Sequence, residues 1–336
     1  MAAMRFENSR RLSKGTAMKA LICGVTGQDG SYLARLLLDK GYEVVGTSRD
    51  AMVASCANLE SMDIRKRILL TSMAINDFRS VLSVVQQHKP DEIYNLAGQT
   101  SVGLSFDQPV EAIESIAQGT LNMLEAIRFV DRPIRFYNAG SSECFGDTQA
   151  GPADEETPFH PRSPYAVAKA SAHWLVRNYR EAYGLYGCTG ILFNHESPLR
   201  PERFVTQKII RGAARIAGGH TGGLELGNIE IQRDWGWAPD YVEAMWKMLQ
   251  QKQADDFVIA TGTSHSLAYF IERAFAWFGL DWQSHVSFNN QLRRPSDITV
   301  SQGNPTKAFQ DLGWRAEFNL DAVIDKMCAA IADEHN

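Results

Sequence analysis

The stretch KALICGVTGQDGSYLARLLLDKG, residues 19–41, decides the fold because three local patterns follow one another without interruption. Residues 20–23 are continuously apolar, which is typical of a strand buried on both faces of a parallel sheet. A turn with three glycines comes next, and residues 31–40 then show the apolar periodicity of a helix that ends at Gly41. The stretch therefore predicts a strand, a tight turn and a helix in succession.

The glycines of this turn have distinct expected roles in a dinucleotide-binding loop. Gly24 permits the tight turn, Gly27 lets the backbone approach a pyrophosphate, and Gly30 allows the helix to pack close to the strand. Their spacing is Gly-x-x-Gly-x-x-Gly rather than the standard Gly-x-Gly-x-x-Gly, so a tight turn without a ligand is the alternative. The predicted cofactor-binding residues of the turn are Gly24, Thr26, Gly27, Gln28, Asp29 and Gly30.

A second apolar run, residues 42–47, predicts a strand whose end would lie beside the adenosine ribose of the cofactor. Asp50 stands at the distance from the glycines at which an acidic residue favours NAD. Ser48 and Arg49 come earlier at the strand end, and a hydroxyl beside a guanidinium suits a 2′-phosphate. We therefore expect NADP as the cofactor, bound in part by Ser48 and Arg49.

Strand and helix patterns continue to alternate along the chain. Strands are expected at 68–70, 92–96 and 134–137 and helices near 77–88 and 119–129, whereas residues 51–66 show no clear pattern. The alternation predicts an α/β fold, a Rossmann-type doubly wound parallel sheet with helices on its faces and a smaller C-terminal substrate-binding lobe. Ligands collect at the carboxyl ends of such strands, where Leu96, Ala97, Gln99 and Ser101 stand.

Residues 138–198 contain most of the side chains suited to catalysis. Tyr165 and Lys169 stand at i and i+4, so on a helix they share one face. A tyrosine has an unperturbed pKa of about 10, and a nearby ammonium would stabilise the phenolate and lower that pKa. Ser141 and Glu143 follow a strand in a glycine-flanked turn and would face the same cleft. The Tyr-x-x-x-Lys spacing arises by chance in many chains, but its place after a glycine turn favours catalysis.

Composition restricts the classes of function. The chain has 336 residues, 44% hydrophobic and 22% charged, as expected for a soluble globular protein with one large domain and a smaller lobe. A net charge of −5 argues against a nucleic-acid partner. The 5 cysteines are widely spaced, so we expect neither a disulfide framework nor a metal site, and a cytoplasmic location fits. No apolar run is long enough to span a bilayer, so no membrane partner is expected.

Three parts of the chain are expected. Residues 1–17 are predicted to be a mobile tail, residues 18–190 mainly an NADP-binding domain with the catalytic residues, and residues 191–336 mainly a substrate-binding lobe with segments that return to the first domain. Basic residues recur over 200–217, and such a run is usually a solvated helix face. Arginines held between Trp, Gly and Pro, such as Arg233, are better suited to anchor phosphates.

Five separate motifs resemble the extended short-chain dehydrogenase/reductase family, and within it the GDP-mannose 4,6-dehydratases. They lie at 24–34, 158–169, 190–198, 233–236 and 303–308, and the resemblance covers residues 19–330. It implies that Tyr165 and Lys169 form the catalytic pair and also touch NADP, with Ser141 as the hydroxyl donor and Glu143 as the acid/base of an elimination. The substrate-binding residues that it implies for GDP-mannose are Gln99, Ser101, Asn194, Val205, Lys208, Leu226, Asn228, Arg233, Arg294 and Asp297.

Three departures from the family pattern accompany this resemblance. Ser72 stands where an aspartate beside the adenine is expected, and Asp297 replaces a glutamate near the guanosine ribose. Residues 49–52 replace an Arg-Arg-Ser-Ser stretch that contacts the 2′-phosphate and a neighbouring subunit, so the expected assembly is a homodimer or a homotetramer.

The resemblance implies oxidation of GDP-mannose at C4, elimination of water across C5 and C6, and return of hydride to C6. A GDP-4-keto-6-deoxymannose reductase or a nucleotide-sugar epimerase would share the fold and the Tyr165/Lys169 pair, but Glu143 favours elimination over both. A non-catalytic dinucleotide-sensing regulator is an alternative of another class, although it would not need Ser141 beside that pair.

Overall fold

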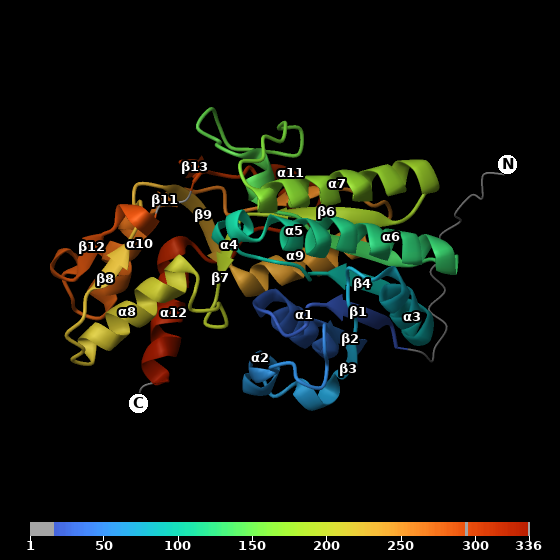
Figure 1. The fold of residues 1–336 in the computed structure, drawn as a ribbon, viewed down its shortest axis with the longest axis horizontal. Coiled ribbons are helices and arrows are strands. Elements are labelled where there is room, and N and C mark those ends of the chain that lie inside the picture. The colour runs from blue at the N-terminus through green and yellow to red at the C-terminus, as the bar shows by residue number, and fades with distance from the viewer. Residues whose placement is uncertain (1–16, 293–294, 335–336) are drawn as a thin grey trace.

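A parallel sheet forms the centre of the structure, a computed structural model that describes residues 17–292 and 295–334 (Figure 1). Within these residues seven strands pair in the order β10-β6-β5-β4-β1-β2-β3, and every neighbouring pair is parallel. The strands are β1 (Lys19–Cys23), β2 (Glu43–Ser48), β3 (Leu69–Ser72), β4 (Glu92–Asn95), β5 (Arg135–Ala139), β6 (Gly187–Leu192) and β10 (Phe257–Ile259). The predicted Rossmann-type sheet is confirmed.

Helices cover both faces of this sheet. One face carries α1 (Gln28–Asp39), α2 (Ala57–Ser61), α9 (Ala238–Gln250) and α11 (Thr306–Leu312), and the other carries α3 (Phe78–His88), α6 (Gly119–Val130) and α7 (Pro164–Tyr183). Ala20 and Ile22 of β1 belong to the core on the first face, and Leu21 and Cys23 to the core on the second. Because both faces are covered, β1 is apolar at successive positions rather than at alternate ones.

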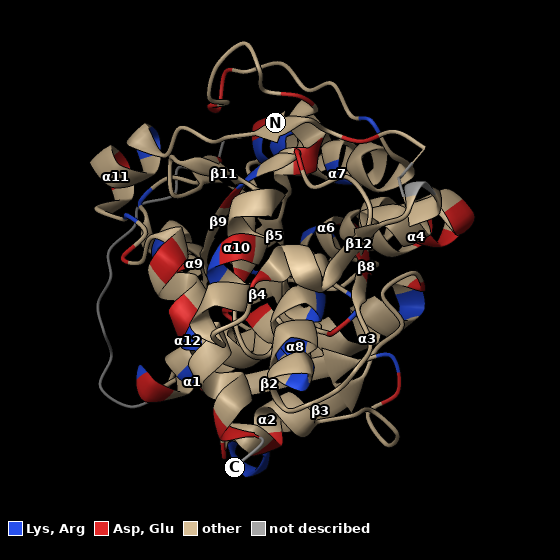
Figure 2. Cartoon of the chain, turned by 90° about the vertical axis from the view of Figure 1, so that its left-hand side faces the viewer, with Lys and Arg blue, Asp and Glu red and all other residues tan. Residues whose placement is uncertain are grey.

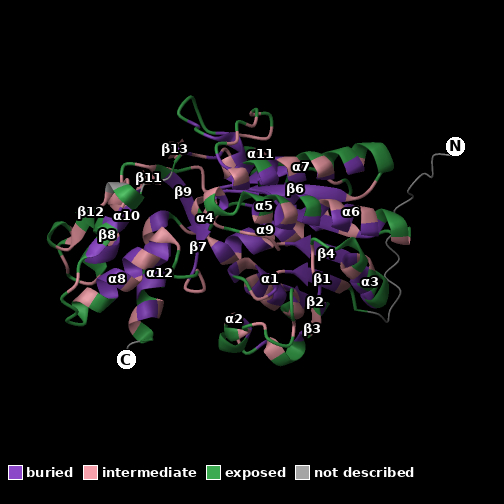
Figure 3. Ribbon diagram, in the orientation of Figure 1, coloured by how far each residue is buried: buried purple, intermediate pink, exposed green. Residues whose placement is uncertain are grey.

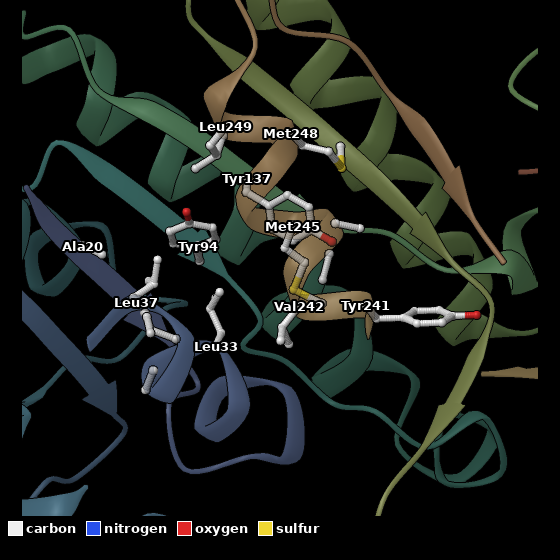
Figure 4. Packing of buried hydrophobic residues seen from close by; sticks show 14 of the residues in the cluster. Ala20, Leu33, Leu37, Tyr94, Tyr137, Tyr241, Val242, Met245, Met248 and Leu249 are labelled. Carbon is white, nitrogen blue, oxygen red and sulfur yellow. The ribbon is translucent and has the colours of Figure 1, made fainter. Parts of the chain in front are cut away.

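The core on the first face holds the start of α1 in place. Leu33 and Leu37 of α1 pack with Met245 of α9 over Tyr94 and Tyr137 of the sheet (Figure 4). All five side chains are 0% exposed. Burial of one aliphatic side chain of this size stabilises a fold by about 1.5–3 kcal/mol, so this layer fixes α1 and with it the glycine turn.

A second lobe with its own core lies at the left of Figure 1. It contains α8 (Val205–Ala217), α10 (Leu267–Trp277), α12 (Leu320–Asp333), β8 (Leu224–Leu226) and β12 (Val286–Phe288). A small sheet of β7 (Asn194–Glu196), β9 (Gln232–Trp237), β11 (Ser264–Ser266) and β13 (Val300–Ser301) adjoins this lobe. Buried residues extend from the central strands into β7 and β9, as Figure 3 shows.

Several elements differ from the sequence-based expectation. The helix expected from residue 31 begins at Gln28. The polar residues of its first turn interrupt the apolar periodicity, so the sequence pattern does not show this start. The unassigned region before α6 contains α4 (Val102–Asp107), α5 (Pro109–Ala112) and the π-helical segment η2 (Ile113–Gln118). Short 3₁₀ segments are η1 (Arg65–Arg67), η3 (Ser142–Phe145), η4 (Trp282–Ser284) and η5 (Asn290–Leu292). The tail predicted at 1–17 lies outside the described residues except for Ala17.

Among the described residues, no helix combines the length and the apolar character that a membrane span requires. In the same part of the chain, no group of three or more His, Cys, Asp or Glu residues is arranged to hold a metal ion.

Candidate active site

A cavity of about 1350 Å³ is lined by residues of the central sheet and of the second lobe. The carboxyl ends of β1, β2, β4 and β5 meet there, because parallel strands end at one edge of the sheet. The predicted site residues that line it are Gly24, Thr26, Gly27, Gln28, Asp29, Gly30, Ser48, Arg49, Leu96, Ala97, Gln99, Ser101, Ser141, Glu143, Tyr165, Lys169, Asn194, Val205, Lys208, Leu226 and Arg233.

Other predicted site residues are not part of this lining. The Ser72 hydroxyl accepts a hydrogen bond from the backbone of the loop after β2 at 2.9 Å. Asn228 holds its own turn through a backbone N–H at 3.0 Å, and Asp297 lies 3.2 Å from Arg233. These three side chains have partners within the protein and lie outside the lining of the cavity, and their ligand contacts stay predictions. Arg294 lies outside the described residues.

Two glycines of the turn differ in their surroundings: Gly30 is closely packed, whereas Gly27 has open space beside it. Gly24 has a φ of +81°, and its carbonyl accepts a hydrogen bond from Gly27 at 3.1 Å. A Cβ on Gly30 would lie 2.3 Å from the Gly24 oxygen and 2.7 Å from Val25 Cα, so only glycine fits. A Cβ on Gly27 would meet only that oxygen, at 3.4 Å. Gly27 is the N-cap of α1 and makes no side-chain cap, so the first turn presents backbone N–H groups that suit a pyrophosphate.

The potential catalytic groups come from the end of β5 and the first turn of α7. Ser141 caps η3 through a 3.3 Å hydrogen bond from the Glu143 N–H, which places hydroxyl and carboxylate in one turn. Ser163 caps α7 and Pro164 begins it, so Tyr165 is held in the first turn, 9% exposed. Burial raises the Tyr165 pKa, a hydrogen bond with Ser141 lowers it, and the charge of Glu143 raises it again.

Lys169 lies on the same face of α7 as Tyr165, as predicted, but its ammonium group contacts a backbone carbonyl. Its Nζ donates a 2.7 Å hydrogen bond to the carbonyl oxygen of Ala139 and lies 5.8 Å from the centre of the Tyr165 ring. Burial lowers the pKa of Lys169 to about 8. For the protein alone, the expectation of a lowered Tyr165 pKa is therefore wrong, because burial of the phenol raises that pKa and is the largest of its causes.

An ion pair connects the glycine turn to β7. His195 Nε2 lies 2.9 Å from Asp29 Oδ2, and Nδ1 lies 2.8 Å from the Phe193 carbonyl oxygen. Because both ring nitrogens face acceptors, the geometry favours the imidazolium. Burial lowers the His195 pKa, but Asp29 outweighs it and the net shift is upward. Burial likewise raises the Asp29 pKa, but His195 outweighs it and holds that pKa below its usual value.

Gln28, the neighbour of Asp29, makes two further hydrogen bonds between the glycine turn and residues 195–197. Its Nε2 donates to the His195 carbonyl at 3.2 Å, and its Oε1 accepts from the Ser197 hydroxyl at 2.8 Å. The side chains of Gln28 and Asp29, predicted to bind the cofactor, are thus engaged with the protein, whereas the backbone of the turn lines the cavity.

Arg233 is held rigidly at the cavity wall. Its side chain is 6% exposed, and one Nη donates to the Ile298 carbonyl at 2.8 Å while the other lies 3.2 Å from Asp297. Asp234 accepts hydrogen bonds of 2.9 and 2.7 Å from the backbone and hydroxyl of Thr261. Burial raises the Asp234 pKa to about 6. The contacts of Arg233 with Ile298 and Asp297 restrict where its guanidinium can point.

The basic residues near α8 fall into two groups. Arg203 and Lys208 line the cavity, and Arg203 donates to the Thr100 hydroxyl at 3.2 Å from the opposite wall. Arg211 and Arg215 form surface ion pairs with glutamates at 2.9 and 2.7 Å. Figure 2 shows basic positions in blue on α8, in the second lobe. The second group is thus a solvated helix face.

Several residues that line the cavity were not predicted from the sequence as site residues. Met73 and Asn76 follow the carboxyl end of β3, so applying the strand-end rule to that strand would have found them. Arg200 lies two residues after the motif at 190–198, at the start of the basic run 200–217, and that run does not distinguish it from the solvated residues. Glu111 lies 3.2 Å from Arg49 and has no local signal, because the two residues are 62 positions apart.

Comparisons with known proteins agree in sequence and in fold. Residues 21–327 match the family described as GDP-mannose 4,6 dehydratase. The chain is 46% identical to GDP-mannose 4,6 dehydratase 1 of Arabidopsis thaliana, over 92% of this chain and 88% of that protein. It is 43% identical to GDP-mannose 4,6-dehydratase of Vibrio cholerae, over 94% and 93% of the two chains. UDP-glucose 4-epimerase of Thermus thermophilus in complex with NAD has the same fold, with a TM-score of 0.82 at 23% identity, over 94% and 99%.

Proposed function

Because the chain belongs to the GDP-mannose 4,6 dehydratase family, we propose that it converts GDP-D-mannose to GDP-4-keto-6-deoxy-D-mannose. The observation that carries the proposal is Glu143, which lines the cavity in the same turn as Ser141 and beside Tyr165. Tyr165 and Ser141 suffice for proton transfer at a hydroxyl that is oxidised. A carboxylate next to them adds the base that an elimination requires.

The proposed cofactor is NADP, held across the glycine turn with its 2′-phosphate near Ser48 and Arg49. Two features of the cavity fit a dinucleotide: the N-terminus of α1, which has no side-chain cap, and the open side of Gly27. When bound there, the cofactor would supply the hydride chemistry that oxidation at C4 and reduction at C6 require. Lys169, at the buried end of the site, is the proposed cation on the nicotinamide ribose side.

The protein residues would move the protons of the reaction. Because burial raises its pKa, Tyr165 would first have to lose its own proton to solvent; as phenolate it would then accept the proton of the C4 hydroxyl while Ser141 donates a hydrogen bond to the same oxygen. The C4 carbonyl acidifies C5–H, so Glu143 could remove that proton and deliver it to the departing C6 hydroxyl, which leaves as water. C5 then takes a proton from solvent, and the proton held by Tyr165 returns to solvent. One water is lost with no net change of oxidation state.

The GDP part of the substrate would lie toward the second lobe. Arg233 is the proposed contact to the diphosphate, because its guanidinium is fixed at the cavity wall. Lys208 adds a second cation, and its Nζ now donates to the Glu225 carbonyl at 2.8 Å. Asn194 and Gln99 line the same cavity as uncharged hydrogen-bonding groups.

One assay tests the proposed function directly. Purified protein is incubated with GDP-mannose and NADP, and the nucleotide sugars are analysed by mass spectrometry. We expect a product that has lost one water without net consumption of NADP. A new chromatographic peak of unchanged mass would identify an epimerase. A reductase would leave GDP-mannose unchanged and would consume NADPH stoichiometrically when GDP-4-keto-6-deoxymannose and NADPH are supplied instead. No conversion of any nucleotide sugar, with the cofactor still bound, would favour a regulator.

The assembly and the compartment are further parts of the proposal. A homodimer or a homotetramer is supported by apolar side chains exposed near α5 and α6, with Val110 66% and Phe129 65% exposed. Sedimentation velocity would measure the assembly, and a monomer at micromolar concentration would contradict it. A cytoplasmic location is supported by the five cysteines, all free and none bridged.

A further inference from the structure

We infer that Glu111 is a specificity-determining residue, whose carboxylate competes with the 2′-phosphate of the cofactor for the guanidinium of Arg49. The inference rests on the proposed use of a nicotinamide dinucleotide at the cavity. It concerns the discrimination between NADP and NAD, which no feature of the glycine turn decides.

The two residues belong to segments that follow different strands of the sheet. Arg49 follows β2, whereas Glu111 lies on α5 in the connection after β4. Both line the cavity, and Arg49 Nη2 lies 3.2 Å from Glu111 Oε1. The side chains are 82% and 40% exposed, so the ion pair sits at the cavity rim, in contact with water. A carboxylate thus stands beside the cation that a 2′-phosphate would use.

Asp50, the acid that sequence spacing suggested as an NAD determinant, has another function in the structure. Its carboxylate accepts a 2.9 Å hydrogen bond from the Met52 N–H and closes a turn. The N–H of Ala51, which lies between Asp50 and Met52, donates to the Ser72 hydroxyl at 2.9 Å. Asp50 does not line the cavity, whereas Glu111 does. The acidic group placed to affect the ribose end of the cofactor is therefore Glu111, not Asp50.

The chemical difference between the two cofactors makes this pair selective. NADP carries a phosphate monoester where NAD carries a neutral hydroxyl, so only NADP must share Arg49 with Glu111 or displace it. An exposed ion pair favours its closed form by a factor of roughly 1.5 to 5. Repulsion between the carboxylate and the phosphate adds to this and is screened by salt. Removal of the Glu111 charge should therefore improve NADP binding by roughly five- to tenfold, with little effect on NAD.

Cofactor titrations of the full chain test the inference. Dissociation constants of NADP and NAD are measured calorimetrically for the unmodified protein, for Glu111→Gln and for Glu114→Gln. Glu114 lies in the next turn, outside the cavity lining, and its variant has the same loss of charge. We expect Glu111→Gln to tighten NADP binding by about five- to tenfold and NAD binding by less than twofold, with Glu114→Gln unchanged. An unchanged ratio of the two constants in Glu111→Gln would refute the inference.

An Arg49→Ala background distinguishes competition from simple repulsion. If Glu111 acts through Arg49, adding Glu111→Gln to Arg49→Ala should improve NADP binding by much less than it does when Arg49 is present. An equal gain in both backgrounds would overturn the competition. These titrations do not depend on turnover: failure of the unmodified protein to dehydrate GDP-mannose refutes the proposed function, whereas a shifted cofactor ratio still supports the role of Glu111.

Discussion

Alanine at the second and the third glycine of the turn should separate cofactor binding from folding. A methyl group on Gly30 would lie 2.3 Å from the Gly24 oxygen and 2.7 Å from Val25 Cα, both backbone atoms that cannot rotate away. A methyl group on Gly27 would meet only the Gly24 oxygen, at 3.4 Å, and would otherwise project into the cavity. Gly30→Ala should therefore damage the fold, whereas Gly27→Ala should damage the ligand site.

Gly30→Ala should change mainly the free energy of unfolding, and Gly27→Ala mainly the free energy of NADP binding. Overpacking costs typically about 1–3 kcal/mol, and the gain of about 1 kcal/mol from alanine inside a helix offsets only part of it. We expect Gly30→Ala to lower the free energy of unfolding by about 1–2 kcal/mol or more. Gly27 has a φ of −74°, which alanine adopts without strain, so its variant should stay within about 1 kcal/mol of the unmodified protein. Its methyl group should weaken NADP binding by roughly tenfold or more, about 1.4 kcal/mol.

Urea unfolding and cofactor titration measure the two effects on the same samples. Gly41→Ala is the matched control, because Gly41 has a φ of +83° and open space around it, far from the cavity lining. It should lower stability slightly through backbone strain and leave the affinity for NADP unchanged. The reasoning would be refuted if Gly27→Ala bound NADP as tightly as the unmodified protein, or if Gly30→Ala were as stable as Gly27→Ala.

Three further predictions concern the chemistry, the substrate contact and the pH dependence. Glu143→Gln should accumulate enzyme-bound NADPH on mixing with GDP-mannose and release little product, whereas Tyr165→Phe should show no NADPH absorbance; solvent-deuterium exchange at C5 at the unmodified rate in Glu143→Gln would exclude Glu143 as the base. Arg233→Lys should raise the KM for GDP-mannose by roughly tenfold, since a lysine cannot hold its protein carbonyl and a diphosphate together, and an unchanged KM would place the contact elsewhere. The Asp29–His195 pair should stabilise the fold most between pH 3.8 and 6.5, the ordinary pKa values of its members. The contribution of His195 fades as pH rises through its raised folded pKa, and that of Asp29 fades as pH falls through its lowered one. The difference in unfolding free energy between the unmodified protein and His195→Gln, measured across this range, should therefore peak there, and a flat difference would contradict the ion pair.

The sequence alone was sufficient for the local units of the fold. An apolar run, a glycine turn and a periodic helix determine β1 and α1, because these patterns depend on neighbours within a few residues. The i, i+4 spacing of Tyr165 and Lys169 correctly placed both side chains on one face of α7. The strand-end rule then brought most predicted site residues to one cavity, since alternating strands and helices imply a parallel sheet.

Only the tertiary structure decided which charges meet and how strongly each is buried. Asp29 and His195 are 166 positions apart and Arg49 and Glu111 are 62 apart, so no local pattern connects them. The spacing of Tyr165 and Lys169 could not show that the lysine nitrogen donates to Ala139 or that burial dominates the pKa of the phenol. A pKa depends on desolvation and on every nearby charge, and both are determined by segments that approach one another only when the chain has folded.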